Sequence, residues 1–280
     1  MENKFKISII TVTKNSESFL QETIDSLSKQ TYQNFEHIIV DAGSSDETHD
    51  AVAQFSFAEL IAIEGCSQSE ALNWGFRHAK YNIICWLNAD DILFKDAFST
   101  ILSMKDEFIN GNCLVYSDYV EMDKDLDSFS YRAILPFSPF VVRNFAIYLP
   151  TSGAFFSKNI VNSGVTLKDD LHYLMDREFY LQLKRNNVKF IKLTKPLAGF
   201  RLHEKQKSAK GKNLAQRSEE RALINSQYGG LWVGGRRLLP WNKLFEFFGY
   251  LYIGFGCRIM SSYALFSRRC EKELTLAKKW

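Results

Sequence analysis

The sequence has few cysteines, little net charge and no long apolar run, and each absence excludes a class of protein. Its five cysteines are scattered and odd in number, without the paired spacing of zinc sites, so we expect neither a disulfide framework nor a cysteine metal centre. A net charge of +3 over 280 residues is too small to indicate a nucleic-acid partner. The amino terminus runs straight into the first predicted strand, which leaves no room for a signal peptide, and we expect a cytoplasmic protein.

Two glycine-rich nucleotide-binding motifs are also missing. No Gly-x-Gly-x-x-Gly follows the first predicted strand, which argues against a dinucleotide-binding fold. No Gly-x-x-x-x-Gly-Lys-Ser/Thr is present, so the phosphate-binding loop of ATPases is absent. A phosphate bound by this chain would have to be held by a cation.

What the sequence does contain is an alternation of strand and helix patterns. Hydrophobic residues make up 46% and aromatic residues 14%, enough for a real core. Between the apolar runs, apolar residues recur at helical spacing, which predicts a parallel sheet with helices on both faces. The strand-like runs are Phe5 to Thr11, Phe35 to Val40, Glu59 to Ile63 and Ile83 to Leu87.

Polar residues stand where these strands end. Asp90 and Asp91 follow the fourth run after Asn88 and Ala89, and adjacent carboxylates repel each other unless a cation or donors lie nearby. The alternative is an Asp-rich helix cap. Thr11, Thr13 and Asp41 stand at the ends of the first two runs. Since ligands of parallel sheets bind at the carboxyl ends of strands, we expect these five residues to converge on one crevice.

Asp41 has two interpretations. Its position at a strand end suits a ligand contact to a base or ribose. The Gly43-Ser44-Ser45 that follows equally favours an Asx turn, in which the carboxylate bonds to nearby backbone.

In combination these segments resemble the family 2 inverting glycosyltransferases. The resemblance covers about the first 200 residues and implies the GT-A fold, a Rossmann-like, mostly parallel sheet with helices on both faces. We accordingly divide residues 1–228 into a nucleotide-sugar half, 1–118, and an acceptor half, 119–228. The motifs that carry the resemblance are Ser8 to Asn15, Gln30 to Asp46, Ala71 to Gly75 and Leu87 to Asp91.

The resemblance implies a donor pocket and a metal site. Asp90 and Asp91 correspond to the Asp-x-Asp region of the family, and with His203 they are expected to hold Mg²⁺ or Mn²⁺. This chain departs from the family at Asn88, where many members carry an Asp, and in the loop from Glu64 to Glu70. The residues expected to bind the nucleotide-sugar are Thr11, Thr13, Asn15, Asp41, Asn73, Asn88, Asp90 and Arg201.

The segment Phe200 to Ser208 also resembles a family motif. His203 could ligate the cation or touch the diphosphate, and Arg201 could offset phosphate charge. A lone histidine is more often structural or merely exposed, and that alternative stays open for His203. The basic cluster from Lys205 to Lys212 reads as a solvated loop or a phosphate-facing segment.

The acceptor half contains a candidate general base. An inverting transfer needs one group to take the proton of the acceptor hydroxyl. In the family this base lies in an acidic motif that opens a helix, and Asp176 is the matching position. Because Asp176 is expected at a helix start, its charge could also do no more than interact favourably with the helix dipole. The alternatives for the base are Glu178, Asp169 and Asp170, although Asp170 could merely cap the helix.

The function implied is an inverting, metal-assisted transfer of a sugar from a nucleotide-diphosphate sugar, expected to be a UDP-sugar, to a hydroxyl group. The expected acceptor is a saccharide or lipid-linked saccharide in cell-surface polysaccharide synthesis. One alternative is a sugar-nucleotide nucleotidyltransferase, although the glycine- and arginine-rich loop of such enzymes is missing after the first strand. Another is a non-catalytic scaffold with the same fold.

Residues 229–280 differ in character and form a predicted helical appendage. An aromatic, apolar segment lies between Arg236-Arg237 and Arg268-Arg269, and Glu246 and Arg258 interrupt it. The segment is shorter than the roughly 20 apolar residues that a membrane span requires. Its composition favours a helix in the membrane interface through residues 236–269, at the inner face of the plasma membrane, or a helical hairpin packed on protein.

Overall fold

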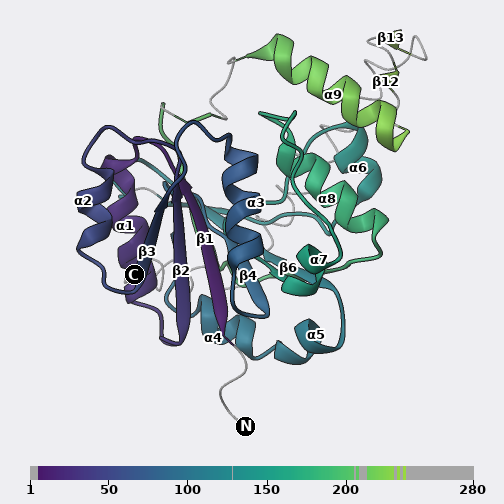
Figure 1. Ribbon diagram of the computed structural model, residues 1–280. Helices are drawn as coiled ribbons and strands as arrows, with labels where there is room; N and C mark the ends of the chain where they lie inside the picture. Colours follow the sequence, from purple (N-terminus) through teal and green to yellow (C-terminus); the bar gives the residue numbers. More distant parts are fainter. Residues whose placement is uncertain are drawn as a thin grey trace.

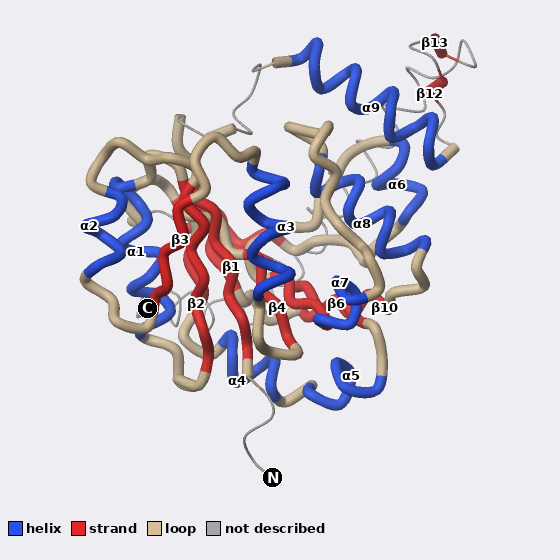
Figure 2. The backbone as a smooth tube through the Cα atoms, in the orientation of Figure 1, coloured by secondary structure: helices blue, strands red, loops and turns tan. Residues whose placement is uncertain are grey.

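The structure is a computed structural model that describes residues 6–127, 129–204, 206–207 and 213–229, and the backbone of residues 232–233 and 236–237. Strands and helices alternate along the first half of the chain, as the sequence predicts. They build a seven-stranded central sheet (Figures 1 and 2). Its strands are β1 (Ile7–Thr13), β2 (Phe35–Asp41), β3 (Ala58–Ala62), β4 (Ile83–Trp86), β6 (Cys113–Ser117), β9 (Ala154–Ser157) and β10 (Lys189–Leu193).

The spatial order of the sheet is β10-β6-β9-β4-β1-β2-β3. All neighbouring strands are parallel except β9, which runs antiparallel to both β4 and β6. The predicted mostly parallel sheet is therefore confirmed. In Figure 1 the chain enters β1 from below, so the carboxyl ends of β1 and β2 lie at the top of the view.

Helices cover both faces of this sheet because successive residues of a strand point to opposite sides. Ile10 of β1 packs with the helices α3 and α8, whereas its neighbour Ile9 packs with α1 and α4. The helices are α1 (Glu17–Ser28), α2 (Thr48–Ala53), α3 (Gln68–His78), α4 (Ala97–Leu102), α5 (Lys105–Asn110), α6 (Pro139–Asn144), α7 (Lys158–Asn162), α8 (Met175–Arg185) and α9 (Leu214–Tyr228).

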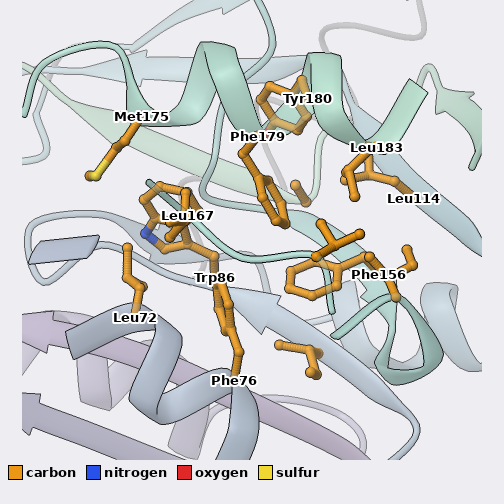
Figure 3. Packing of buried hydrophobic residues seen from close by; sticks show 14 of the residues in the cluster. Leu72, Phe76, Trp86, Leu114, Phe156, Leu167, Met175, Phe179, Tyr180 and Leu183 are labelled. Carbon is orange, nitrogen blue, oxygen red and sulfur yellow. The ribbon is translucent and has the colours of Figure 1, made fainter. Parts of the chain in front are cut away.

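Aromatic rings join α3 and α8 on one face of the sheet (Figure 3). The ring centroids of Phe76 and Phe156 are 5.1 Å apart at 85°, and those of Phe156 and Phe179 are 5.7 Å apart at 67°. Such edge-to-face pairs each add about 0.5–1.5 kcal/mol beyond the burial of area. This packing holds the start of α8 in a fixed position relative to β4.

Gly75 brings the backbone of α3 close to the sheet. A Cβ atom at this position would lie 2.3 Å from Cγ2 of Ile10, a β-branched side chain in the middle of β1. We expect Gly75→Ala to lower the free energy of unfolding by about 1–3 kcal/mol, since an overpacked core must shift backbone or rotamers. Urea denaturation checks this, with Gly111→Ala as the control, because a Cβ there meets no atom closer than 3.6 Å. Equal stability of the two variants would contradict the expectation.

A second, four-stranded sheet lies beside the first and is built from distant segments. Its strands are β5 (Ile92–Leu93), β11 (Ala198–Arg201), β7 (Tyr119–Met122) and β8 (Phe129–Arg132), in that spatial order. Ile92 pairs with Gly199, so the segment after β11 is held beside the two aspartates that precede β5. This pairing determines the surroundings of Asp90 and Asp91.

The predicted appendage, residues 229–280, lies outside the described residues except for Gly229 and two short strands. These strands, β12 (Trp232–Val233) and β13 (Arg236–Arg237), pair antiparallel. Within the part of the chain that the structure describes, no helix combines the length and apolar character needed to cross a bilayer.

Candidate active site

The candidate residues surround one cleft of about 790 Å³ at the carboxyl ends of β1 and β4. Its walls come from the segments after these two strands, the 147–151 loop, the approach to α8, the segment after β11, and α9. Ligands of such sheets bind at this edge. Two carboxylates, Asp90 and Asp176, are among the residues that line it.

Asp90 and His203 meet at the wall of the cleft. Nε2 of His203 lies 3.0 Å from a carboxylate oxygen of Asp90, and both residues line the cleft. The imidazole packs on the ring of Phe19, with centroids 4.4 Å apart, and its buried Nδ1 has no hydrogen-bond partner. The two residues that the sequence places 113 positions apart are thus neighbours in the fold.

This pair fits a divalent cation, the metal that the fold family implies. No cluster of three or more His, Cys, Asp or Glu ligands exists among the described residues. Mg²⁺ and Mn²⁺ do not need one, because such cations are held by one or two carboxylates together with the phosphates of a substrate. Asp90 and His203 therefore offer two ligands to a cation that a diphosphate would complete.

Asp91 does not face the cleft, which corrects its predicted place beside Asp90 in the metal site. Its carboxylate is 0% exposed and accepts hydrogen bonds from Ser152 Oγ at 2.5 Å, Asn88 Nδ2 at 2.9 Å and Arg201 N at 3.0 Å. Burial, and then the charge of Asp90, raise the pKa of Asp91 to about 7. Asp91 therefore joins three chain segments behind the cleft wall.

Asn88 lines the cleft, but its amide is already engaged. Its Nδ2 donates to Asp91 and, at 3.2 Å, to Thr151 Oγ1, while its Oδ1 accepts from the indole of Trp86 at 3.0 Å. The backbone N of Asn88 also donates to Ser152 Oγ. Asn88 thus fixes the 151–152 loop against the end of β4, through contacts between segments about 63 residues apart.

Arg201 is also placed differently from its prediction as a phosphate contact. The side chain is 1% exposed and does not line the cleft. Its guanidinium donates to the backbone carbonyls of Asp90 and Lys124 at 2.9 Å, and it forms an ion pair with Glu22. Arg201 therefore holds the backbone of Asp90 in position from behind.

The two threonines of β1 differ in depth. Thr11 lies within the sheet, away from the cleft, and its hydroxyl is 2.9 Å from Nε2 of the buried His37, whose pKa burial lowers to about 3. Thr13 lines the cleft at the end of the strand, and its buried hydroxyl has no hydrogen-bond partner. Of the two, only Thr13 is placed to meet a ligand.

Asp41 forms the Asx turn that was one of its two interpretations. It accepts hydrogen bonds from Ser44 N at 3.0 Å, from Ser44 Oγ, and from His49 Nε2 at 2.8 Å. Burial raises the pKa of Asp41, but these hydrogen bonds outweigh it and leave the pKa below its ordinary value. Ser44 Oγ in turn accepts from the backbone N of Asn15 at 2.8 Å. Asn15 lines the cleft with a left-handed φ of 53°, so Asp41 supports the Asn15 loop from outside it.

Asn73 and Glu70 stabilise the fold around the cleft and do not form its surface. Asn73 is 6% exposed, and its amide bonds to both the N and the O of Leu167, which ties α3 to the chain before α8. Glu70 completes a capping box with Ser67 at the start of α3. Neither side chain lines the cleft, because both are used to fix α3.

Asp176 lines the cleft at the start of α8. One of its oxygens accepts from the N of Arg177 at 2.7 Å. Burial raises the pKa of Asp176, against the lowering effects of that hydrogen bond and of the charges of Arg177 and Lys207. The three other acidic residues of the segment, Glu178, Asp169 and Asp170, do not line the cleft.

A basic corner of the cleft was not predicted as part of the site. Lys207 and Arg217 line the cleft together with Tyr173. Lys207 belongs to the basic cluster of the sequence, where spacing could not distinguish a solvated loop from a site. Arg217 reaches the cleft from α9, because Glu220 of the same helix accepts hydrogen bonds from the backbone N of residues 172, 173 and 174 at 2.8–2.9 Å.

Curated relatives match the amino-terminal part of the chain. An uncharacterized glycosyltransferase of Rickettsia bellii is 30% identical over 122 residues, which is 42% of this chain and 18% of the relative. The UDP-Glc:alpha-D-GlcNAc-diphosphoundecaprenol beta-1,3-glucosyltransferase WfgD of Escherichia coli is 29% identical over 118 residues, 41% of this chain and 46% of WfgD. The chain thus spans less than half of the length of either relative.

Solved structures extend the similarity over most of the fold. The S. aureus TarS 1-349 complex with UDP-GlcNAc matches with a TM-score of 0.61 at 16% identity, covering 79% of this chain and 66% of that one. The mannosyltransferase PcManGT of Pyrobaculum calidifontis, in complex with GDP-Man and Mn²⁺, matches with a TM-score of 0.60 at 15% identity over 96% of this chain and 76% of that one. At these identities the likeness concerns the fold.

The family is decided by the sequence itself. The model of glycosyl transferase family 2 matches residues 8–163, more than half of the chain, and includes β1, β2, β4 and the Asp90 segment. The chain therefore belongs to glycosyl transferase family 2 and has the GT-A fold of these enzymes.

Proposed function

We propose that this protein transfers a sugar from a nucleotide-diphosphate sugar to an acceptor hydroxyl with inversion of configuration, using Asp176 as the general base. The observation that carries the proposal is the arrangement of the two cleft carboxylates. Asp90 is paired with His203 after the end of β4, and Asp176 lines the same cleft from a different element, at the start of α8, where burial raises its pKa. One carboxylate can serve the leaving diphosphate while the other serves the attacking hydroxyl.

The nucleotide is expected to bind along the segment after β1. Thr13 offers a buried hydroxyl without a partner, and Asn15 and Lys14 follow it on the same wall. Asp41 contributes indirectly by holding Ser44 against the backbone of Asn15. UDP-sugar is the expected donor class, which agrees with the UDP-GlcNAc bound by TarS, although PcManGT binds GDP-Man.

Asp90 and His203 would hold the divalent cation, with Asn88 and Asp91 keeping the Asp90 segment in place. When bound, the cation neutralises charge that develops on the diphosphate as it departs. Arg201 and Asp91 keep Asp90 aimed at the cleft, through the bonds from Arg201 Nε to Asp90 O and from Arg201 N to Asp91. This support from behind preserves the site's geometry during the reaction.

Asp176 would take the acceptor proton. The acceptor oxygen forms a bond to the anomeric carbon as the bond from that carbon to the diphosphate oxygen breaks, and the electron pair leaves with the nucleoside diphosphate. The hydroxyl proton passes to Asp176 in the same step. A raised pKa makes Asp176 a stronger base than an exposed aspartate.

The acceptor is expected to be a saccharide or a lipid-linked saccharide used in cell-surface polysaccharide synthesis. The name of the E. coli relative gives it an acceptor of this kind, a GlcNAc-diphosphoundecaprenol. Peripheral contact with the inner face of the plasma membrane through residues 236–269 is part of the same proposal and concerns residues outside the described ones.

The proposal is tested first by a thermal-shift screen of UDP, GDP, dTDP and CMP, each with and without Mn²⁺. A ligand present at a hundred times its Kd should stabilise the protein by about 2.7 kcal/mol. We expect a Mn²⁺-dependent rise in Tm with one nucleoside diphosphate, followed by product of inverted anomeric configuration when the matching donor sugar and an acceptor are supplied. A folded protein that responds to no nucleotide would favour a non-catalytic scaffold, and a product of retained configuration would exclude the single displacement.

A further inference from the structure

Two cations in the basic corner of the cleft share one aromatic ring. Nζ of Lys207 lies 5.5 Å from the centroid of Tyr173, and Cζ of Arg217 lies 5.2 Å from the same centroid. Lys207 donates to Oε1 of Gln68 at 3.0 Å, and Arg217 donates to the backbone O of Lys207 at 3.2 Å. These contacts link α3, the approach to α8, the segment after β11 and α9.

Neither cation has a carboxylate partner within ion-pair distance among the described residues. Nε of Arg217 is buried and has no hydrogen-bond partner. Burial lowers the pKa of Lys207 to about 8, although the charges of Glu220 and Asp176 partly oppose this and that of Arg217 adds to it. A desolvated positive charge without a counter-ion is costly, so this corner is suited to an anionic ligand.

The corner is built before any ligand arrives. Glu220 is 3% exposed and receives the three backbone N–H groups that precede α8, which fixes α9 to the segment of Tyr173. Arg217 lies three residues before Glu220 on the same helix, so the same contact sets its position. A preorganised pair of cations loses little side-chain entropy on binding.

We propose that Lys207 and Arg217 bind a phosphate group of the acceptor, so that the acceptor is a phosphorylated saccharide, free or linked to a lipid. This inference rests on the proposed function, since it takes Asp176 to mark the acceptor side of the cleft. Lys207 is close enough to Asp176 for each to affect the ionisation of the other, and Tyr173 lies three residues before Asp176. The donor diphosphate has its own partners at Asp90 and His203.

The charge of the corner favours phosphate over a single carboxylate. Two cations without a carboxylate at ion-pair distance match a dianion, and a guanidinium can donate two parallel hydrogen bonds to phosphate oxygens. A phosphate held here would position the neighbouring sugar hydroxyl relative to Asp176. The corner would then select acceptors by charge.

The test is calorimetric titration of the full chain, saturated with Mn²⁺ and the nucleotide found in the screen. The probe is α-D-glucose 1-phosphate, and its neutral counterpart is methyl α-D-glucoside. We expect the phosphate probe to bind at least about tenfold more tightly to the wild type, as charge-assisted hydrogen bonds imply. The double variant Lys207→Met and Arg217→Met should lose this preference while its nucleotide affinity stays within about twofold.

Two further variants control for charge and for folding. Lys184→Met with Arg185→Met removes the same charge from the exposed end of α8, outside the cleft, and should keep the preference. Lys207→Arg with Arg217→Lys retains both charges and should restore most of it. If the Met variant does not fold, Lys207→Gln and the salt dependence of phosphate binding to the wild type give the same answer, since a phosphate contact weakens with salt.

The outcomes separate the inference from the proposed function. No preference in the wild type, an equal loss in the Lys184 and Arg185 control, or a tenfold loss of nucleotide affinity in the Met variant would overturn the inference. The last result would assign the corner to the donor diphosphate. If no nucleotide binds, the proposed function fails, and the glucose 1-phosphate titration is repeated in EDTA. If the wild type then prefers glucose 1-phosphate and the Met variant does not, the phosphate site is still supported. If the wild type shows no preference, the phosphate site is overturned.

Discussion

Replacing Asp176 by Asn is expected to lower the rate of sugar transfer by about two to four orders of magnitude, because a positioned general base contributes that much. The amide has the size of the carboxylate and can still accept from the N of Arg177, so the start of α8 should be preserved. Donor affinity should remain unchanged, since the donor's proposed partners lie on other segments. Single-turnover rates and nucleotide affinities of the two proteins check this.

The matched control is Asp170→Asn, an exposed carboxylate of the same acidic segment that does not line the cleft. Its transfer rate should stay close to that of the wild type. Glu178 is 0% exposed and accepts from the hydroxyl of Tyr228, so its replacement should affect stability more than chemistry. A rate in Asp176→Asn within threefold of the wild type would place the base elsewhere.

The pH dependence gives a second check on Asp176. The base must be ionised to accept a proton, and burial raises its pKa above the ordinary aspartate value of about 4. Transfer should therefore decline as the pH falls through this raised pKa, which lies at a higher pH than the pKa of an exposed aspartate. The residual rate of Asp176→Asn should lack this acid limb. An identical limb in both proteins would assign it to another group.

The second large effect is expected when Asp90 and Asp91 are replaced one at a time, because one replacement should lower stability and the other should remove the response to metal. Asp91→Asn places an NH₂ group where the carboxylate receives only donors, from Ser152 and Asn88 on one oxygen and from Arg201 N on the other. Whichever way the amide turns, at least one buried donor loses its acceptor, so we expect a loss of about 2–3 kcal/mol of unfolding free energy. Nucleotide binding by the fraction that remains folded should still respond to Mn²⁺.

Asp90→Asn should show the opposite pattern. Its side chain is 29% exposed and bonds to His203 alone among described side chains, so stability should change by less than about 1 kcal/mol. The Mn²⁺ dependence of nucleotide binding should disappear, because a carboxylate ligand is lost. Urea denaturation and nucleotide titration with and without Mn²⁺ measure both quantities. Loss of the metal response in Asp91→Asn but not in Asp90→Asn would reverse the assignment.

Much of the fold could be predicted because its periodicities are local. The alternation of apolar runs with helical spacing predicted the parallel sheet. The predicted runs Phe5 to Thr11, Phe35 to Val40 and Ile83 to Leu87 correspond to β1, β2 and β4, with ends that differ by one or two residues. The antiparallel β9 in the middle of the sheet was not predicted as such. Its insertion between β4 and β6 depends on pairing between segments about 40 to 70 residues apart, which no local pattern encodes.

The candidate site was predicted less completely. Asp90, His203 and Asp176 do lie around one cleft. Asp91, Arg201 and Asn73 are instead buried behind its walls, where they hold the surrounding segments in place. Asp90 and Asp91 illustrate the reason. The chain turns at Asp90, where the N of Asp91 donates to the O of Asn88, so one carboxylate lines the cleft and the other is buried in the protein interior. A motif gives the positions of such residues in the chain without giving their directions.

The sequence by itself determined the family, the mostly parallel sheet and the strand ends at which polar residues gather. These depend on spacing along the chain, which is present before folding. Tertiary structure alone decided which polar groups face the cleft and which are hydrogen-bonded within the protein. It also brought Arg217 of α9 beside Lys207, through the contact of Glu220 with the backbone before α8. Such contacts form between distant segments only when the chain is packed. A buried polar side chain must find a hydrogen-bond partner, and which side chains are buried depends on the packing and not on the residue type alone.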